Sequence, residues 1–194
     1  WLRGRRALKI LLRDLEFVDP TSDFSDIDTS ATFFPHPAFS LTHSQDMAIA
    51  IACMAPAFGV GVDLELIRAT KPQMSKFYLG DADRKWLETV PSENRNVEQI
   101  RLWTVKEAVF KSDLNNLDRT MLKYKIEDAS VICGKAFTLE VDGVQDFQYM
   151  SKRFGDYWIS VSLSHGEPGA KTLEAKEGEA KVAESREAKA RATR

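Results

Sequence analysis

The feature that most constrains this chain is a strict alternation of residue types between positions 60 and 66. Apolar residues occupy every second position, with glycine or an acid between them: Val60, Gly61, Val62, Asp63, Leu64, Glu65 and Leu66. A period of two predicts a β-strand with one apolar face and one acidic face. Asp63 and Glu65 then point the same way, with Cα atoms roughly 7 Å apart at about 3.3 Å per residue. Two acids on a strand this apolar need a partner cation, so the pattern predicts a cation site.

A second acidic stretch lies about forty residues further along the chain. Good helix formers run from Val97 to Lys111, and Trp103, Glu107 and Lys111 recur at intervals of four residues. Residues at this spacing share one face of a helix. If the helix crosses the acidic strand, Glu107 completes an all-oxygen site for a hard divalent ion, with Lys111 one turn away to meet an anion. Two simpler interpretations stay open, because surface helices use such Glu–Lys pairs and edge strands carry solvated acids.

Length and composition limit the class of protein. The chain has 194 residues, of which 43% are hydrophobic, enough for one compact domain or two small lobes. A formal net charge of −2 gives no global basic field, so we expect neither nucleic acid nor a membrane surface as a partner. Cys53 and Cys133 are the only cysteines and form no metal-spaced pair, which indicates a reduced, cytoplasmic protein. The apolar run Met47–Val62 is too short to span a bilayer, and we expect a buried hairpin there.

Helical and strand patterns alternate along the chain and predict an α+β fold. Leu2–Phe17 has the pattern of an amphipathic helix with a basic face. Met47–Met54 alternates large residues with alanines, which predicts a strand that lets a helix pack closely on its small face. Asp81–Leu87 predicts a short helix, and Pro91–Asn96 predicts a loop before the longer helix. Strand patterns return between residues 137 and 163.

The order of helix and strands occurs twice, which indicates two similar α/β lobes. The segment Asp156–Ser162 also echoes Gln45–Ile51. We therefore expect lobes at residues 1–66 and 67–165, with a ligand site in the cleft between them. Residues 166–194 contain almost no large apolar side chains and predict a disordered or exposed helical tail.

Three motifs in order resemble those of a known family. They are Phe39-Ser40-Leu41-Thr42-His43-Ser44, Gly61-Val62-Asp63-Leu64-Glu65 and Trp103-Thr104-Val105-Lys106-Glu107-Ala108-Val109-Phe110-Lys111. Their order and spacing are similar to the signatures of the 4′-phosphopantetheinyl transferases of the surfactin-synthetase-activating type. The start of the chain, Trp1-Leu2-Arg3-Gly4-Arg5-Arg6-Ala7-Leu8, resembles a helix start in the shorter bacterial members, especially the accessory holo-acyl-carrier-protein synthase of enterobacteria. The resemblance covers about residues 1 to 165 and implies a pseudo-dimer of two lobes with the active site between them.

The resemblance implies transfer of the 4′-phosphopantetheine arm of coenzyme A to a serine of an acyl or peptidyl carrier protein. Adenosine 3′,5′-bisphosphate is then the leaving group. Mg²⁺ held by Asp63, Glu65 and Glu107 would bridge the pyrophosphate of coenzyme A. Glu107 is the expected general base, directly or through a water, and Lys111 is expected to stabilise the phosphoryl oxygens. We expect a monomer, and the pathway that it serves stays open between fatty-acid, polyketide and peptide synthesis.

The nucleotide end of coenzyme A is expected to contact Arg5, Thr42 and His43, together with Lys111. Thr42 and His43 lie in a polar turn at a strand end, where a hydroxyl and an imidazole can donate to phosphate oxygens. Family members use the matching histidine to bind coenzyme A, and Arg5 matches their coenzyme-phosphate arginine, with Arg3 and Arg6 as further candidates. The segment Phe33–Pro37 stands where the family has Gly-Lys-Pro, so the family's lysine contact to the nucleotide has no evident counterpart.

Two other functions remain open from the sequence. One is another Mg²⁺-dependent phosphotransferase or nucleotide hydrolase that uses the same three acids, although the chain has no glycine-rich phosphate loop. The other is a non-catalytic homologue that only binds carrier proteins, for which loss of the lysine contact would be a sign of decay.

Overall fold

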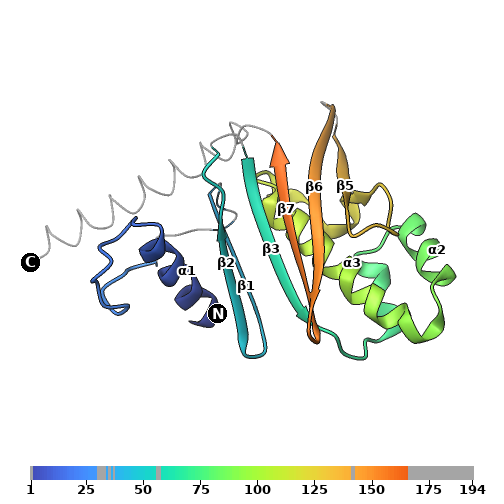
Figure 1. Ribbon diagram of the computed structural model, residues 1–194. Coiled ribbons are helices and arrows are strands. Elements are labelled where there is room, and N and C mark those ends of the chain that lie inside the picture. Colours follow the sequence, from blue (N-terminus) through green and yellow to red (C-terminus); the bar gives the residue numbers. More distant parts are fainter. Residues whose placement is uncertain are drawn as a thin grey trace, which may run out of the picture.

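The computed structural model describes residues 2–29, 34, 36, 38–55, 58–140 and 143–165, which form an α+β protein with two antiparallel sheets (Figure 1). The smaller sheet pairs β1 (Phe39–Ser44) with β2 (Met47–Ala52). The larger sheet has the strand order β3-β7-β6-β5-β4. Its strands are β3 (Phe58–Leu66), β4 (Lys125–Ile126), β5 (Cys133–Glu140), β6 (Gly143–Phe154) and β7 (Tyr157–His165). The predicted α+β class is confirmed.

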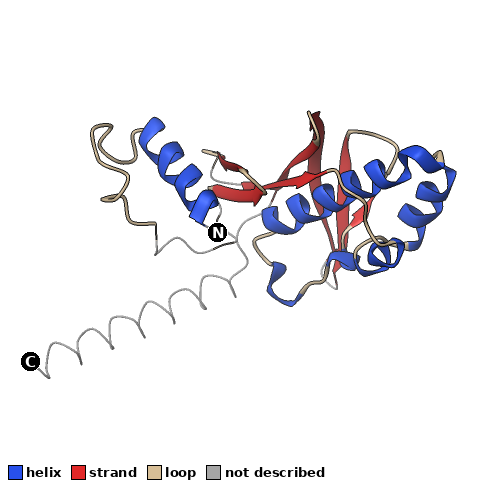
Figure 2. Cartoon of the chain, turned by 90° about the horizontal axis from the view of Figure 1, so that it is seen from below, coloured by secondary structure: helices blue, strands red, loops and turns tan. Residues whose placement is uncertain are grey.

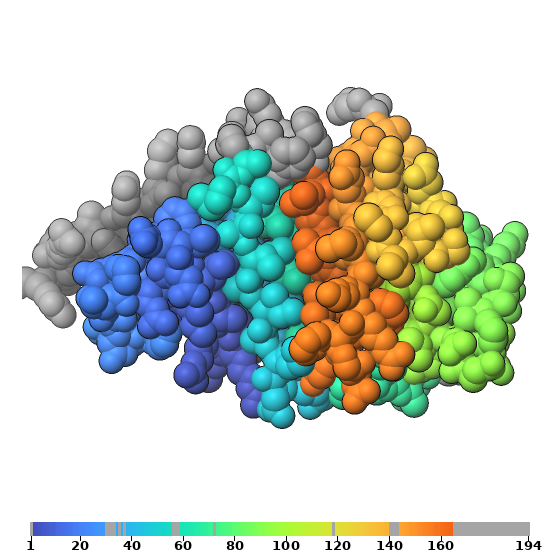
Figure 3. All heavy atoms as spheres, viewed as in Figure 1, coloured from blue at the N-terminus to red at the C-terminus, as the bar shows by residue number. Residues whose placement is uncertain are grey.

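Different helices pack on the two sheets. They are α1 (Leu2–Asp14), α2 (Asp81–Thr89) and α3 (Ser92–Ser112), with short 3₁₀ turns η1 (Pro72–Phe77), η2 (Asn116–Asp118) and η3 (Met121–Lys123). α1 packs on β2, as the small face of that strand predicts, and α3 packs across β3 and β7 (Figure 2). On the side of the large sheet away from α3, the surface shows α1, the β1–β3 region, β7 and β6 side by side (Figure 3). No helix in the described part of the chain is long and apolar enough to cross a membrane.

Two helix boundaries differ from the sequence prediction. α1 ends at Asp14 rather than near Phe17, because Glu16 takes a left-handed backbone conformation with φ of 58°. The predicted loop at 91–96 is wrong, because α3 already begins at Ser92. Pro91 precedes that helix, and its carbonyl accepts the amides of residues 94 and 95 at 2.9 and 3.0 Å. A proline suits the start of a helix because the first amides have no intrahelical acceptor.

The predicted hairpin over residues 47–62 is also wrong. β2 pairs with β1, whereas β3 pairs with β7, with Val62 opposite Val161. A strand with one apolar face is stabilised most by a neighbour whose apolar residues lie on the same face. The apolar residues of β7 stand opposite those of β3 and meet this condition. By backbone pairing β3 joins the strands of residues 133–165, whereas the predicted lobe 1–66 includes it.

The division into lobes 1–66 and 67–165 stays a prediction, as does the pseudo-dimer. In the described residues the two sheets differ in size, with two strands in one and five in the other. The predicted tail at 166–194 and most of the Phe33–Pro37 segment lie outside the described residues.

An apolar core holds α3 in place. It gathers buried side chains from the segment after η1 and from α2, α3, β4, β5 and β6, among them Leu79, Leu102, Val105, Val109 and Phe147. This core lies on the face of the large sheet that also carries Asp63, so it sets the helix against the acidic strand.

Candidate active site

β3 presents Asp63 and Glu65 to α3. Val62 and Leu64, which point the other way, are completely buried, and Asp63 is only 4% exposed. The two acids stand opposite Ser160 and Trp158 of β7. The strand period predicted from the sequence thus places both carboxylates on the helix-facing side of the sheet.

α3 approaches β3 so closely that only glycine fits at two positions of the strand. A Cβ atom on Gly61 would lie 1.9 Å from the carbonyl oxygen of Ala108, and one on Gly59 would lie 2.2 Å from that of Ser112. The neighbouring strand is also small on this face, and the Ser112 and Ser162 hydroxyls meet at 3.1 Å. This close packing brings the helix residues at 107 and 111 to the carboxylates of β3.

Lys111 and Thr42 both bind one oxygen of Asp63. Lys111 Nζ lies 2.7 Å from Asp63 Oδ1, and Thr42 Oγ1 donates to the same atom at 3.0 Å. Lys111 Nζ also donates to the carbonyl of Val62 at 3.2 Å. Asp63 Oδ2 is buried without a hydrogen-bond partner. One oxygen of the carboxylate is therefore saturated, and the other is left free.

Glu107 and Glu65 both titrate above their ordinary range. Burial raises the pKa of Glu107 to about 7, the charges of Asp63 and Glu65 add to this, and the ammonium of Lys111 opposes it. Burial is also the main cause of the raised pKa of Glu65, followed by the charge of Asp63. Hydrogen bonds from Trp103 and Ser44 lower it in part. The three carboxylates thus interact electrostatically, and the ammonium of Lys111 offsets only part of their mutual repulsion.

The donor chemistry of these acids fits a hard divalent cation, but their arrangement around Lys111 is not a closed metal site. In the described residues no group of three histidine, cysteine or acidic side chains has a geometry that could hold a metal ion. The unpartnered Asp63 Oδ2 and the neighbouring Glu65 and Glu107 supply oxygen ligands of the kind that Mg²⁺ takes. The Mg²⁺ site stays a prediction.

A cavity of about 320 Å³ joins Lys111 to the N-terminal helix. Lys111 and Phe110 of α3 line it, together with Arg5 of α1, Phe34 and Leu41. The guanidinium of Arg5 donates to the carbonyl of Thr29 and lies 5.5 Å from the centre of the Phe34 ring. Arg5 also lines a second cavity of about 480 Å³, which contains Arg6 and Lys9. The two cavities therefore share Arg5, and their linings together include Lys111 of α3 and the cationic side chains of α1.

Thr42 and His43 do not act together in this structure. Thr42 is buried and binds Asp63, whereas His43 is exposed on the opposite face of β1. A Cβ atom on Gly4 would lie 3.8 Å from the imidazole of His43, which places that ring against α1. Successive strand residues point to opposite faces, so the predicted phosphate-binding pair is divided.

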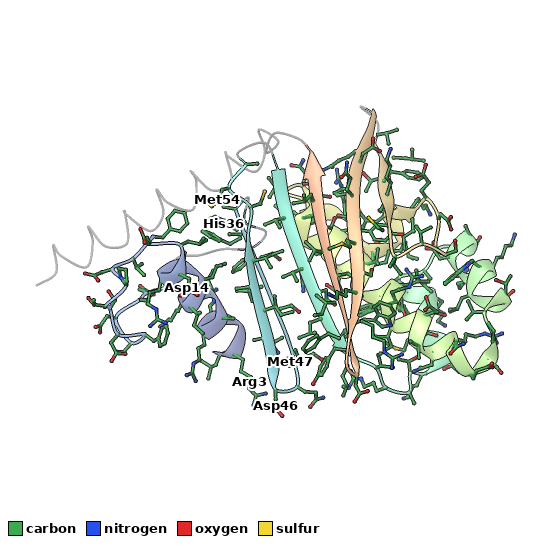
Figure 4. All side chains as sticks on the ribbon, viewed as in Figure 1. Arg3, Asp14, His36, Asp46, Met47 and Met54 are labelled. Atoms are coloured by element: carbon green, nitrogen blue, oxygen red, sulfur yellow. The ribbon has the colours of Figure 1, made fainter. Side chains whose placement is uncertain are left out.

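Arg3, a further candidate for the coenzyme phosphate, is engaged elsewhere. Its guanidinium pairs with Asp46 at 2.7 Å and donates to the carbonyl of Gln45 (Figure 4). Arg3 thus ties the start of α1 to the β1–β2 turn, at the end of the hairpin.

Two features that support the site were not assigned from the sequence. The first is Lys106, whose ammonium is fully buried and pairs with Asp83 of α2 at 3.0 Å, away from Asp63. It also donates to the carbonyl of Tyr124, so it anchors α3 to the core. The second is the pair of hydroxyls of Ser40 and Ser44, which flank the assigned Thr42 at the strand period of two residues.

The comparisons with known proteins bear on the segment that holds the acids. A family model described as "4'-phosphopantetheinyl transferase superfamily" matches residues 59–162, which is more than half of the chain. The chain belongs to the 4′-phosphopantetheinyl transferase superfamily. The matched segment includes Asp63, Glu65, Glu107 and Lys111, whereas Arg5, Thr42 and His43 lie outside it. The match shows the superfamily and does not decide the surfactin-synthetase-activating type.

Some solved structures are similar to this chain at low sequence identity. The holo-[acyl-carrier-protein] synthase of Thermotoga maritima is 15% identical, with a TM-score of 0.44, over 56% of this chain and 64% of that one. A structure named "Chronobacterium ammoniagenes ACPS-CoA complex" is 18% identical, with a TM-score of 0.38, over 57% of this chain and 98% of that one. The chain thus spans less than two thirds of the Thermotoga protein. No curated protein matches the chain.

Proposed function

We propose that this protein transfers the 4′-phosphopantetheine arm of coenzyme A to a serine of an acyl or peptidyl carrier protein in a Mg²⁺-dependent reaction. The observation that carries the proposal is the convergence of Asp63, Glu65, Glu107 and Lys111 beside a cavity that Arg5 reaches from the other side. Membership of the superfamily supports it.

In the proposed reaction the serine hydroxyl attacks the β-phosphorus of coenzyme A. A new bond forms between the serine oxygen and phosphorus, and the bond from phosphorus to the oxygen of the departing adenosine 3′,5′-bisphosphate breaks. The electron pair leaves with that oxygen, and the serine proton passes to Glu107, directly or through a water. Mg²⁺, held by Asp63, Glu65 and Glu107, would neutralise charge on the pyrophosphate.

Glu107 suits the role of a base near neutral pH. In the metal-free protein its pKa is about 7, and a bound Mg²⁺ would favour the ionised carboxylate, which can accept a proton. Lys111 Nζ lies beside Asp63 and interacts electrostatically with Glu107. It can stabilise the phosphoryl oxygens as negative charge shifts toward them.

The two cavities support an extended binding mode for coenzyme A. The volume of about 320 Å³ beside Lys111 is at the lower end of the range for small-molecule sites. The second cavity continues past Arg5 to Arg6 and Lys9. Guanidinium groups bind phosphate well, so Arg5 is our candidate for the nucleotide phosphate, with His43 as a second proposed contact.

Intact mass spectrometry tests the proposal. An apo carrier protein is incubated with this protein and coenzyme A, with Mg²⁺ or with EDTA. We expect a Mg²⁺-dependent gain equal to one phosphopantetheine arm. Glu107→Gln should abolish the gain with an intact fold, and Glu93→Gln, in the first turn of the same helix, is the matched control that should retain it.

Other outcomes would replace the proposal. Release of inorganic or nucleotide phosphate without a modified carrier would indicate a different phosphotransferase or a hydrolase. No modification of fatty-acid, polyketide or peptidyl carriers, with retained carrier binding, would indicate a non-catalytic homologue. Normal transfer by Glu107→Gln would remove Glu107 from its role as base.

The finer identity is also proposed. We place the protein with the surfactin-synthetase-activating type, as a cytoplasmic monomer built as a pseudo-dimer of two lobes. In the described residues both Cys53 and Cys133 are free, as a reducing compartment requires. Light scattering measures the oligomeric state, and a trimer or dimer would contradict this assignment.

A further inference from the structure

The hydroxyl groups of β1 reach the edge of β3 at every second residue. Ser40 Oγ accepts the amide of Val62 at 3.0 Å, and Ser44 Oγ accepts that of Leu66 at 3.3 Å. No backbone pairing joins the two strands, so these side chains replace the ladder of a sheet at this junction. The hydroxyl between them, that of Thr42, is spaced to reach the same edge but binds a carboxylate instead.

Thr42 binds Asp63 in a buried environment. Thr42 is 5% exposed and Asp63 is 4% exposed, and the two oxygen atoms lie 3.0 Å apart. A hydrogen bond to a charged group is stronger than a neutral one, and water competes little at this burial. The contact therefore fixes the orientation of the Asp63 carboxylate.

Both donors to Asp63 bind the same oxygen. Thr42 and Lys111 reach Oδ1 from β1 and α3, while Oδ2 is buried without a partner. An unpartnered buried carboxylate oxygen is unfavourable unless something else binds it. The two bonds thus hold Asp63 by Oδ1 and leave Oδ2 able to bind an additional electropositive group.

A threonine hydroxyl carries one hydrogen. Thr42 donates that hydrogen to Asp63, and a phosphate group offers only acceptors once it is ionised. Thr42 therefore cannot donate to a coenzyme phosphate while it holds Asp63.

We propose that Thr42 is a positioning residue that presents Asp63 Oδ2 to a divalent cation, and not a ligand of coenzyme A. The identity of the cation rests on the proposed function. Ser44 plays a weaker version of the same role, because its hydroxyl donates to Glu65 Oε2 at 3.3 Å. By these contacts the N-terminal strand sets the geometry of acids that lie on β3.

Metal binding to the protein alone tests the proposal. The concentration of free Mn²⁺ is followed by electron paramagnetic resonance during titration, without coenzyme A or carrier protein. Thr42→Val keeps the shape but removes the hydroxyl, and we expect its Mn²⁺ affinity to fall by about 10-fold or more, as is typical when a partner of a metal ligand is lost. Thr42→Ser, which keeps the hydroxyl, should stay close to the wild type.

Ser40→Ala is the matched control. It removes a neighbouring hydroxyl of β1 that binds a backbone amide and no carboxylate, so it should weaken the junction without changing Mn²⁺ affinity. If Thr42→Val does not fold, Thr42→Ala provides the same comparison with a smaller side chain.

Steady-state kinetics separate the two roles of Thr42. We expect Thr42→Val to need more Mg²⁺ for half-maximal rate, with an unchanged KM for coenzyme A at saturating Mg²⁺. A raised KM for coenzyme A with unchanged Mn²⁺ affinity would overturn the inference and restore Thr42 as a coenzyme contact.

The outcomes for the inference and for the proposed function are distinct. Equal Mn²⁺ affinity of wild type and Thr42→Val, or no Mn²⁺ binding by the wild type, overturns the inference even if the carrier gains its arm. A Thr42-dependent Mn²⁺ site without any transfer supports the inference and removes the proposed function.

Discussion

The close contact between β3 and α3 makes Gly61→Ala the most informative single change. The added Cβ would lie 1.9 Å from the carbonyl oxygen of Ala108 and 2.6 Å from the amide nitrogen of Ser112. Both are backbone atoms of α3, so no side chain can rotate away to relieve the clash. Ordinary contacts begin at 3.4 Å, so the helix would have to retreat by roughly 1.5 Å.

The displacement of α3 should lower both the stability of the fold and the rate of transfer. Overpacking a core typically destabilises by about 1–3 kcal/mol. Because α3 also carries the buried core residues Leu102, Val105 and Val109, we expect the upper end, about 3 kcal/mol. A displacement of about 1 Å at a reacting group can lower a rate by about 100-fold. Glu107 moves with α3, so transfer should fall by a similar factor even in molecules that remain folded.

Urea unfolding followed by tryptophan fluorescence measures the change in stability, and the mass assay measures transfer. Gly80→Ala is the matched control, since a Cβ there meets its nearest atoms at 3.6 and 3.7 Å. Gly80 precedes α2 as its N-cap, so the control should be destabilised by at most about 1 kcal/mol. The reasoning is refuted if Gly61→Ala unfolds within about 0.5 kcal/mol of the wild type, the usual range for neutral surface changes.

Three further predictions address charge. The pKa of Glu107 is about 7 in the folded protein against 4.5 for the free group, so its carboxyl group stabilises the fold below pH 4.5 and this contribution is lost as the pH rises to 7. In EDTA, Glu107→Gln should therefore gain stability relative to the wild type between pH 5 and 8, and a constant difference would contradict the assignment. Lys106→Met leaves the charge of Asp83 buried and should lower the free energy of unfolding by about 3–5 kcal/mol, whereas Asp83→Asn combined with it should recover part of that loss in urea titrations. Arg5→Ala should raise the KM for coenzyme A roughly 10-fold with little change in kcat, as expected for a charge-assisted hydrogen bond. Arg3→Ala should leave that KM unchanged, and equal effects of the two variants would remove Arg5 as a specific contact.

Some of the fold could be predicted because local patterns report backbone geometry directly. The strand at β3, the helix α2 and the helical character of α3 follow from periods of two and 3.6 residues. Pairing could not be predicted in the same way. The choice of β7 as the partner of β3 depends on residues about 100 positions apart in the chain, and no local pattern near residue 62 indicates it.

The start of α3 shows a similar limit. Pro91 and the polar residues after it have the composition of a loop, but Arg95 donates to carbonyls at the end of α2 and holds the two helices together. A tertiary contact thus overrides weak local preference, as is common at helix boundaries.

For the site, the sequence by itself determined which side chains share a face. Asp63 and Glu65 lie two residues apart on a strand, and Glu107 and Lys111 lie four apart on a helix, so backbone repeat alone sets each pair side by side. Only the tertiary structure decided that Lys111 binds Asp63, that Thr42 faces the acids while His43 faces α1, and that the pKa of Glu107 rises to about 7. These depend on which surfaces pack together and on how much water they exclude, and such packing is the result of free-energy contributions from the whole chain rather than from any one segment.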